Sequence, residues 1–118
     1  MGSERIAKTR KAAKEQIAHP PEPPGHLSKR MKEFWRTVFS INNPQPHEVL
    51  LLVKACEAHD RAEQARRVLK REGLVYLDRF EKPKARPEVG IELTSKTLFA
   101  GILKQIHLHN MSWEYLDD

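Results

Sequence analysis

Apolar side chains recur at helical spacing in three stretches of this 118-residue chain. The first stretch, residues 29–40, carries five large apolar side chains three or four positions apart: Met31, Phe34, Trp35, Val38 and Phe39. This spacing places them on one face of a helix and predicts that the face is buried, with Trp35 as an anchor of the core. Ser28 stands at the N-cap position, where a hydroxyl can accept a hydrogen bond from an amide of the first turn.

The second stretch predicts a long helix from Pro46 to Glu72. Proline is favoured at the first position of a helix, and Gly73 can adopt the left-handed conformation that often ends one. Six small or apolar residues alternate at spacings of four and three: Leu51, Ala55, Ala58, Ala62, Ala65 and Leu69. Because the centre of this seam is alanine, another helix can approach closely along it. The seam is our candidate for helix packing and oligomerisation, and it is equally compatible with packing inside one chain.

The third helix is expected to run from Pro87 to about His109. It would bury five apolar side chains: Leu98, Phe99, Ile102, Leu103 and Ile106. Residues 74–77 have the β-branched and aromatic content of a short strand, but no clear second strand follows, and residues 78–87 are interpreted as a charged loop. These patterns predict an all-α fold of three main helices with a long central helical hairpin.

The two ends of the chain differ, because residues 1–18 have only Ile6 and Ile17 as larger apolar side chains, whereas the tail after residue 109 holds Met111, Trp113, Tyr115 and Leu116 beside acids. Residues 1–18 form too short and too polar a segment to hold a stable helix alone, so we expect a flexible basic arm. Four prolines within residues 19–25 favour an extended spacer, with a ligand for a polyproline-binding groove as the alternative. The expected organisation is a Pro-rich basic arm (1–27), a helical core and oligomerisation domain (28–109), and a C-terminal tail (110–118) that docks on the core or binds a partner.

The net charge of +5 is distributed unevenly. Residues 1–32 hold eight Lys and Arg against three acids, whereas residues 33–118 hold thirteen of each sign. Basic arms of this kind are typical of polyanion-binding proteins, although a solubilising tail is the alternative. The candidate DNA-binding residues lie in the arm and first helix (Arg5, Lys8, Arg10, Lys11, Lys14, Lys29, Arg30) and at the end of the long helix (Arg66, Arg67, Lys70, Arg71).

Such cations would contact backbone phosphates and carry little sequence information. The cluster at residues 66–71 has an alternative interpretation as a solvated face paired with Glu63 and Glu72. No group of Arg, Asn and Gln marks a recognition helix, so the sequence gives no sign of base-specific readout.

No motif in the sequence predicts catalysis. A Walker loop, a dinucleotide fingerprint, a Gly-x-Ser-x-Gly elbow and paired zinc cysteines are all absent, so we expect a non-enzymatic protein without a cofactor. Cys56, His59 and Asp60 share one helical turn, but a zinc site needs three or four convergent ligands, and no metal site is predicted. Cys56 is expected to point into an apolar helix face, where its pKa is raised and the thiol is inert.

The sequence also limits where the protein is expected to act. The single cysteine, Cys56, excludes an intramolecular disulfide and fits a reducing compartment. No run approaches the roughly 20 apolar residues that cross a bilayer, and the first residues do not have the pattern of a signal peptide. We therefore expect a cytoplasmic protein with no membrane partner.

The order of these signals resembles a known family. A proline-rich lead over residues 20–28 runs into a helix with Trp35. A long helix containing residues 51–56 follows and ends at Leu69-Lys70-Arg71-Glu72-Gly73; a charged hairpin-like loop then leads to a last helix at Pro87. Over residues 20–109 the chain resembles the small subunit of phage terminase.

This resemblance implies a non-enzymatic adaptor for DNA packaging in the cytoplasm of a bacterial host cell. Such a protein binds double-stranded viral DNA, forms a homo-oligomeric ring and regulates the large terminase subunit. Carried onto this chain, the basic arm would contact DNA and the seam from Leu51 to Leu69 would form the ring. The alternative is a small dimeric helical regulator that binds DNA or RNA, and a third class is an enzyme whose site is not recognisable from sequence.

Overall fold

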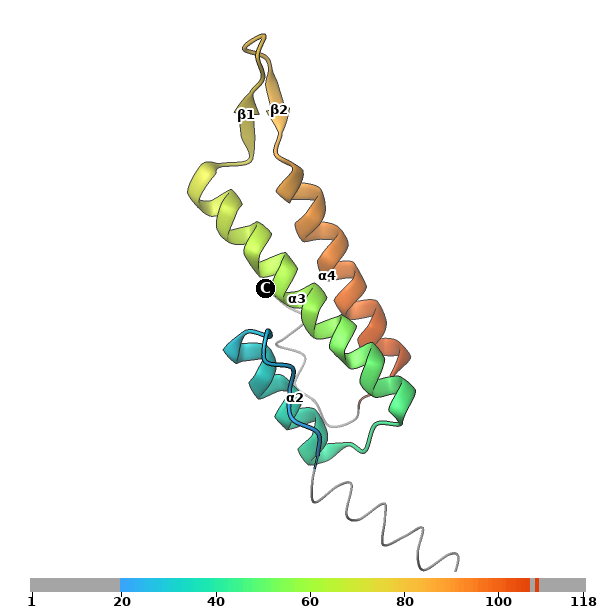
Figure 1. Cartoon of the computed structure of the whole chain (residues 1–118). Coiled ribbons are helices and arrows are strands. Elements are labelled where there is room, and N and C mark those ends of the chain that lie inside the picture. The colour runs from blue at the N-terminus through green and yellow to red at the C-terminus, as the bar shows by residue number, and fades with distance from the viewer. Residues whose placement is uncertain (1–19, 107, 109–118) are drawn as a thin grey trace, which may run out of the picture.

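A computed structural model describes residues 20–106 and residue 108 of the chain. Its elements in chain order are α2 (Lys29–Ile41), α3 (Pro46–Glu72), β1 (Val75–Leu77), β2 (Pro83–Ala85) and α4 (Pro87–Gln105). The described part is mostly helical, which confirms the all-α fold with three main helices. Helices α3 and α4 lie side by side as a long antiparallel hairpin, and α2 packs beside one half of it (Figure 1).

The start of α2 is fixed by two hydrogen bonds at Ser28. Its hydroxyl accepts from the backbone N–H of Met31 at 3.2 Å, which confirms the predicted cap. Its own backbone N–H donates to Oδ2 of Asp60 on α3 at 2.8 Å. The first turn of α2 is therefore held against the middle of α3.

The proline-rich lead belongs to the folded part of the chain. Residues 20–27 run back along α2 (Figure 1), and the ring N–H of Trp35 donates to the carbonyl of Pro21 at 2.8 Å. Leu27 is buried in the core, one residue before the boundary at Ser28 that the sequence suggested. The packed domain thus begins inside residues 1–27, the segment that the sequence pattern predicts as the arm.

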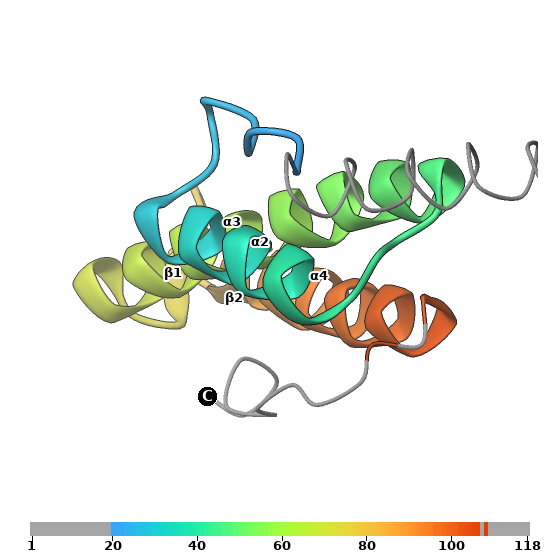
Figure 2. The ribbon, with the colours of Figure 1, turned by 90° about the horizontal axis from the view of Figure 1, so that it is seen from below.

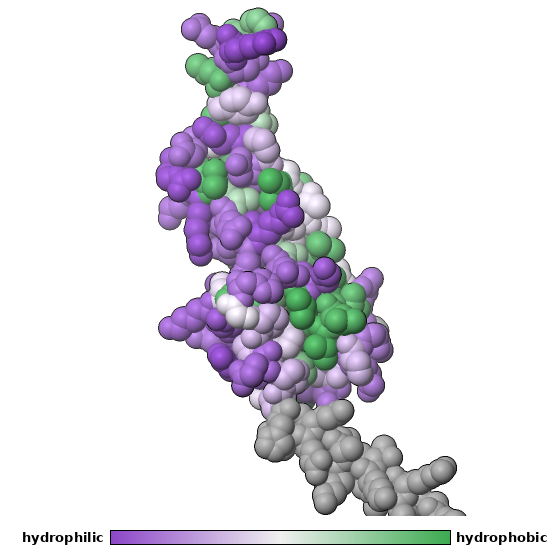
Figure 3. All heavy atoms as spheres, in the orientation of Figure 1, coloured by the Kyte–Doolittle hydropathy of each residue, from purple (hydrophilic) through white to green (hydrophobic). Residues whose placement is uncertain are grey.

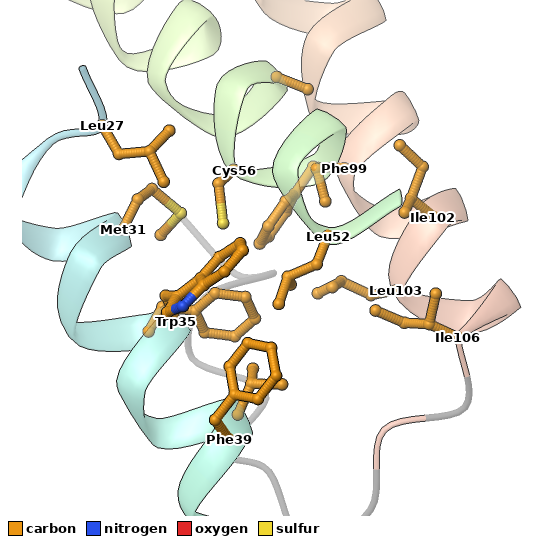
Figure 4. Close-up of a cluster of buried hydrophobic side chains, with 14 residues drawn as sticks. Leu27, Met31, Trp35, Phe39, Leu52, Cys56, Phe99, Ile102, Leu103 and Ile106 are labelled. Carbon is orange, nitrogen blue, oxygen red and sulfur yellow. The ribbon is translucent and has the colours of Figure 1, made fainter. Parts of the chain in front are cut away.

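The core lies where all three helices meet. Seen from below in Figure 2, α2 covers the α3/α4 pair, and Figure 4 shows side chains from the three helices pointing toward one centre. Trp35 is only 2% exposed, and the rings of Phe34 and Phe99 meet edge to face with centroids 5.9 Å apart. The largest fully buried side chains are Trp35, Phe34, Met31, Leu52, Val38 and Cys56.

Two expectations for the last helix were wrong. Leu98 is 51% exposed rather than buried, because its neighbour Phe99 takes the inward position and residue 98 lies about 100° further around the helix. The helix also ends at Gln105 instead of near His109, since Ile106 leaves helical geometry. The other four side chains predicted to be buried from this helix, Phe99, Ile102, Leu103 and Ile106, lie in the core.

The segment between α3 and α4 forms a two-stranded antiparallel sheet: the short strand predicted at residues 74–77 is confirmed as β1, but the interpretation of residues 78–87 as a loop was wrong over Pro83–Ala85. The register pairs Val75 with Ala85, Tyr76 with Lys84 and Leu77 with Pro83. The second strand has no β-branched or aromatic residue, and pairing with the first strand, together with the turn, compensates for its low propensity. We call residues 74–86 the ribbon; it stands off the end of the helical hairpin (Figure 1).

Candidate nucleic-acid interface

Four cations lie together on the outer face of the last turns of α3. Arg66, Arg67, Lys70 and Arg71 are all exposed and follow the i, i+1, i+4, i+5 pattern of one helix face. The opposite face carries Ala62, Ala65 and Leu69, which are buried. Arg71 forms an ion pair with Glu72 at 3.0 Å, but both side chains are largely exposed, so this contact restrains the cation only weakly.

The ribbon continues from this basic face through Gly73. The backbone there adopts a φ of +88°, and its N–H donates to the carbonyl of Leu69 at 2.8 Å, which closes the last turn of the helix. A residue with a β-carbon would be strained in this conformation. Gly73 therefore ends α3 and redirects the chain into the first strand of the ribbon.

The tip of the ribbon is held by Asp78. Its carboxylate accepts from the backbone N–H of Phe80 at 2.8 Å and from that of Lys82 at 3.0 Å. The N–H of Glu81 donates to the carbonyl of Asp78, and Glu81 itself has a φ of +60°. This is the three-residue hairpin loop in which a type I turn precedes a left-handed residue. The turn brings Arg79 and Phe80 to the outermost point of the ribbon.

Alternation along the strands gives the ribbon two different faces. Val75, Leu77, Pro83 and Ala85 share the apolar face, because cross-strand partners and residues two apart point the same way. The other face carries Tyr76 and Lys84. Arg86 joins this face, with its guanidinium 5.8 Å from the centre of the Tyr76 ring.

At the tip, the guanidinium of Arg79 lies 4.8 Å from the centre of the Phe80 ring. Phe80 is itself 66% exposed. Stacking on a ring holds an arginine in place without neutralising its charge. The ribbon thus presents Arg79, Lys82 and Lys84 to the solvent, while Arg86 is half-buried beside Tyr76.

Charge in the described part of the chain is concentrated at this end. Residues 66–86 hold eight Lys and Arg against three acids, while residues 20–65, 87–106 and 108 together hold eight of each sign. The whole positive excess of the described residues therefore lies on the end of α3 and on the ribbon. We call residues 66–86 the basic end.

Sequence reasoning found only half of the basic end. Arg66, Arg67, Lys70 and Arg71 were singled out, but the ribbon cations Arg79, Lys82, Lys84 and Arg86 were assigned to a loop. Lys29 and Arg30 lie in the first turn of α2, whose cap is bound to Asp60, six residues and about 9 Å along α3 from Arg66. The arm residues Arg5, Lys8, Arg10, Lys11 and Lys14 lie outside the described residues.

The alanine seam is used inside the chain. Leu51 is half-buried, and the other five residues, Ala55, Ala58, Ala62, Ala65 and Leu69, are buried. Ala58 borders a groove with Pro87, Gly90 and Ile91 of α4, and Ala65 lies near Glu88 and Ile91. Of the two arrangements that the pattern allowed, the structure contains the close packing of α3 against α4. A contact between copies would need another surface.

Such a surface lies on α4. Val89, Leu93 and Leu98 are exposed by 38%, 68% and 51%. The exposed positions between and beside them, Gly90, Thr94, Thr97 and Gly101, are all uncharged. We call these seven residues the α4 stripe. Apolar side chains are visible over the helical hairpin and near the tip of the ribbon in Figure 3.

Cys56 and His59, whose side chains are of types common in catalysis, are both buried in the helical core. Cys56 is fully buried, and desolvation, followed by the negative charges of Asp60 and Glu57, raises the pKa of its thiol from 9.0 to about 12. This confirms the predicted burial of Cys56 and the predicted rise of its thiol pKa, and a buried thiol of this kind is expected to be inert. His59 is buried against Phe99, with ring centroids 5.0 Å apart. Within residues 20–106 and 108, no three His, Cys, Asp or Glu side chains are grouped as metal ligands.

A groove with a volume of about 710 Å³ runs between α3 and α4. Its polar side chains are Lys54, Glu57, Arg61, Thr94 and Ser95, beside the apolar Ala58, Ile91 and Leu98. The groove holds neither a histidine nor a cysteine, and it is an open depression over the hairpin. It has the character of a packing surface.

Comparisons with known protein families, with curated proteins and with solved structures find no match to this chain. In the part of the chain that the structure describes, no helix is both long enough and apolar enough to cross a membrane.

Proposed function

We propose that this chain is a non-enzymatic DNA-packaging adaptor of the terminase small-subunit type. It binds double-stranded viral DNA, assembles into a ring of copies and regulates the large subunit of the packaging motor. The observation that carries the DNA-binding part is the basic end. It contains eight Lys and Arg and only three acids, on two adjoining elements that are exposed to solvent. A polyanion with closely spaced phosphates complements such a surface.

The α4 stripe supports the self-assembly part of the proposal. Helix α4 buries one side against α3 and the core, and its exposed positions from Val89 to Gly101 include three apolar side chains and no charged one; the exposed Lys104 follows one turn later. Contiguous apolar patches on a surface otherwise rich in charge are typical of protein contacts. We therefore place the contact between copies on this stripe.

The solution mass, measured by light scattering over a range of salt concentrations, tests the assembly. We expect a closed assembly of many subunits. A stable monomer or dimer would instead favour the alternative function, a dimeric helical DNA- or RNA-binding regulator. Stimulation of the large subunit's ATPase separates the two further, because only the packaging adaptor is expected to produce it.

A pair of variants locates the contact. Leu93→Glu places a charge in the middle of the α4 stripe and is expected to dissociate the assembly, because burying an unpaired carboxylate is costly. Leu50→Glu is the matched control: Leu50 is 71% exposed but lies on α3, and its replacement should leave the mass unchanged. Equal behaviour of the two variants would place the contact elsewhere.

A further inference from the structure

The apolar and aromatic side chains of the ribbon add nothing to the helical core. All six strand residues are exposed, and Leu77 and Phe80 are 64% and 66% exposed. No ribbon residue belongs to the core cluster. A two-stranded hairpin alone is marginally stable in water. Its exposed aromatic and apolar groups therefore indicate a contact with another molecule.

We propose that the ribbon enters the major groove of double-stranded DNA while the cations at the end of α3 contact the flanking phosphates. This inference rests on the proposed DNA-binding function and assigns it to one element. The major groove is about 12 Å wide and admits a two-stranded β-ribbon. From Leu74 to Phe80 the ribbon extends roughly 20 Å at about 3.3 Å per residue. That exceeds the groove's depth of about 8.5 Å, so the tip can reach the floor.

The distribution of cations along the ribbon fits this arrangement. Arg79 and Lys82 lie at the tip, where base edges would be, whereas Arg86 lies at the base of the ribbon, with Arg66 and Arg67 on the adjoining helix. Cations at the base would bind the phosphates that border the groove, and those at the tip would face acceptors such as guanine N7 and O6.

Duplex DNA fits the ribbon better than a single strand does. Binding of single strands depends on aromatic rings with free faces on which bases stack. The two rings of the ribbon, Tyr76 and Phe80, each already lie near a guanidinium, that of Arg86 or Arg79. These contacts hold the arginines in place and occupy a face that a base would use. The ribbon also contains no Asn or Gln, so adenine would not be read by a bidentate amide.

The decisive experiment compares two triple variants that remove the same charge. The ribbon variant carries Arg79→Ala, Lys82→Ala and Lys84→Ala. The control variant carries Arg36→Ala, Lys54→Ala and Lys104→Ala, which remove exposed cations outside residues 66–86. Binding to a labelled duplex of about 30 base pairs, three helical turns, is measured by fluorescence anisotropy at several salt concentrations. Circular dichroism checks that both variants keep the helical content of the wild type.

We expect the ribbon variant to bind at least about tenfold more weakly. Its slope of log K against log salt should fall by about 0.9, because Arg79 and Lys82 face base edges and only Lys84 is lost as a phosphate contact. The control variant should stay within about threefold of the wild type with an unchanged slope. If both triple variants bind alike while the wild type binds duplex, the ribbon is not the site and the general DNA-binding function stands. If the wild type binds no duplex at all, the proposed function itself fails.

Methylation of guanine N7 by dimethyl sulfate then identifies the groove. The wild type should protect N7, which lies in the major groove, and the ribbon variant should not. Absence of protection by bound wild type, or its displacement by the minor-groove ligand netropsin, would overturn insertion into the major groove. Tighter binding of one strand of the same sequence than of the duplex would overturn it as well.

Discussion

The two halves of the α3/α4 hairpin are built from different kinds of residue. In the covered half, next to α2, large aromatic and aliphatic side chains fill the core, and it contains all the largest fully buried groups. In the open half, towards the ribbon, α3 buries only Ala62, Ala65 and Leu69. The end of this open half and the ribbon, residues 66–86, carry the whole excess of positive charge among the described residues. The side chains that stabilise the fold and those that carry the excess charge therefore lie at opposite ends of one pair of helices.

This separation has a physical advantage. Clustered cations repel one another, and a polar surface offers little apolar area to bury. The cations lie on the half of the hairpin that α2 does not cover, where α3 buries mainly alanine. Their mutual repulsion is therefore kept away from the three-helix core. The covered half can hold the fold while the open half offers its surface to a partner, and substitutions should therefore have very different effects in the two halves.

The largest effect is expected in the covered half from Trp35→Ala. Removing this side chain leaves a cavity and breaks the hydrogen bond to Pro21, so the free energy of unfolding should fall by about 3–5 kcal/mol. Urea unfolding followed by circular dichroism measures it. Trp35→Phe keeps a ring but loses the N–H donor and should cost clearly less. A loss below about 1 kcal/mol for the alanine variant would mean that the three-helix core does not dominate stability.

An intermediate effect is expected from Ala62→Leu in the open half. The larger side chain would force α3 and α4 apart and should destabilise the fold by about 1–3 kcal/mol. Gln64→Leu, at an exposed position two residues away, is the control and should be nearly neutral. Thermal unfolding of both variants gives the comparison. Equal stability of the two would show that the seam is not closely packed.

Alkaline pH should selectively weaken the covered half through Cys56. Because the folded state raises the thiol pKa from 9.0 to about 12, it holds the proton more tightly than the unfolded chain. The resulting stability is fully present below about pH 9 and is lost as pH rises toward 12. One unit above the unfolded pKa the loss is about 1.4 kcal/mol. Unfolding of the wild type and Cys56→Ala across pH 8–10.5 measures it, and parallel curves would contradict the prediction.

The smallest effect is expected on the ribbon from Leu77→Thr. The side chain is exposed and touches no core residue, so the free energy of unfolding should change by no more than about 0.5 kcal/mol. The same urea titration applies. A larger loss would mean that the ribbon stabilises the helices. The free energy of unfolding would then not come mainly from the covered half.

The helices were predictable because their signals are local. Met31 to Phe39 show one apolar stripe, Ser28 is a standard cap, and Pro46, Gly73 and Pro87 mark helix ends within a residue. The sequence could not show which helix packs against the alanine seam, since the same spacing serves packing within one chain and between chains. Leu98 was misplaced because the sequence does not show that Phe99 faces the core while Leu98, one position earlier, lies at the exposed edge of the same helix.

The candidate site was predictable only where it is helical. The cations from Arg66 to Arg71 follow a helical repeat, whereas the second strand of the ribbon, Pro83 to Ala85, has no strand-forming side chain to reveal it. Its pairing comes from the turn around Asp78. An acid that begins a three-residue loop between two extended segments was the available signal, and it would have placed Arg79, Lys82 and Lys84 on one protruding element.

The docking of Pro21 on Trp35 has a consequence for the number of points at which one molecule can hold a polyanion. Because residues 20–27 run back along α2, the chain that precedes them starts at the end of the bundle away from the ribbon (Figure 1). The point where residue 20 enters the fold and the proposed DNA contact on the ribbon then lie at opposite ends of one rigid spacer. A long polyanion bound at one point would raise the effective concentration at the other. Affinity would then depend on the length of the DNA as well as on its charge.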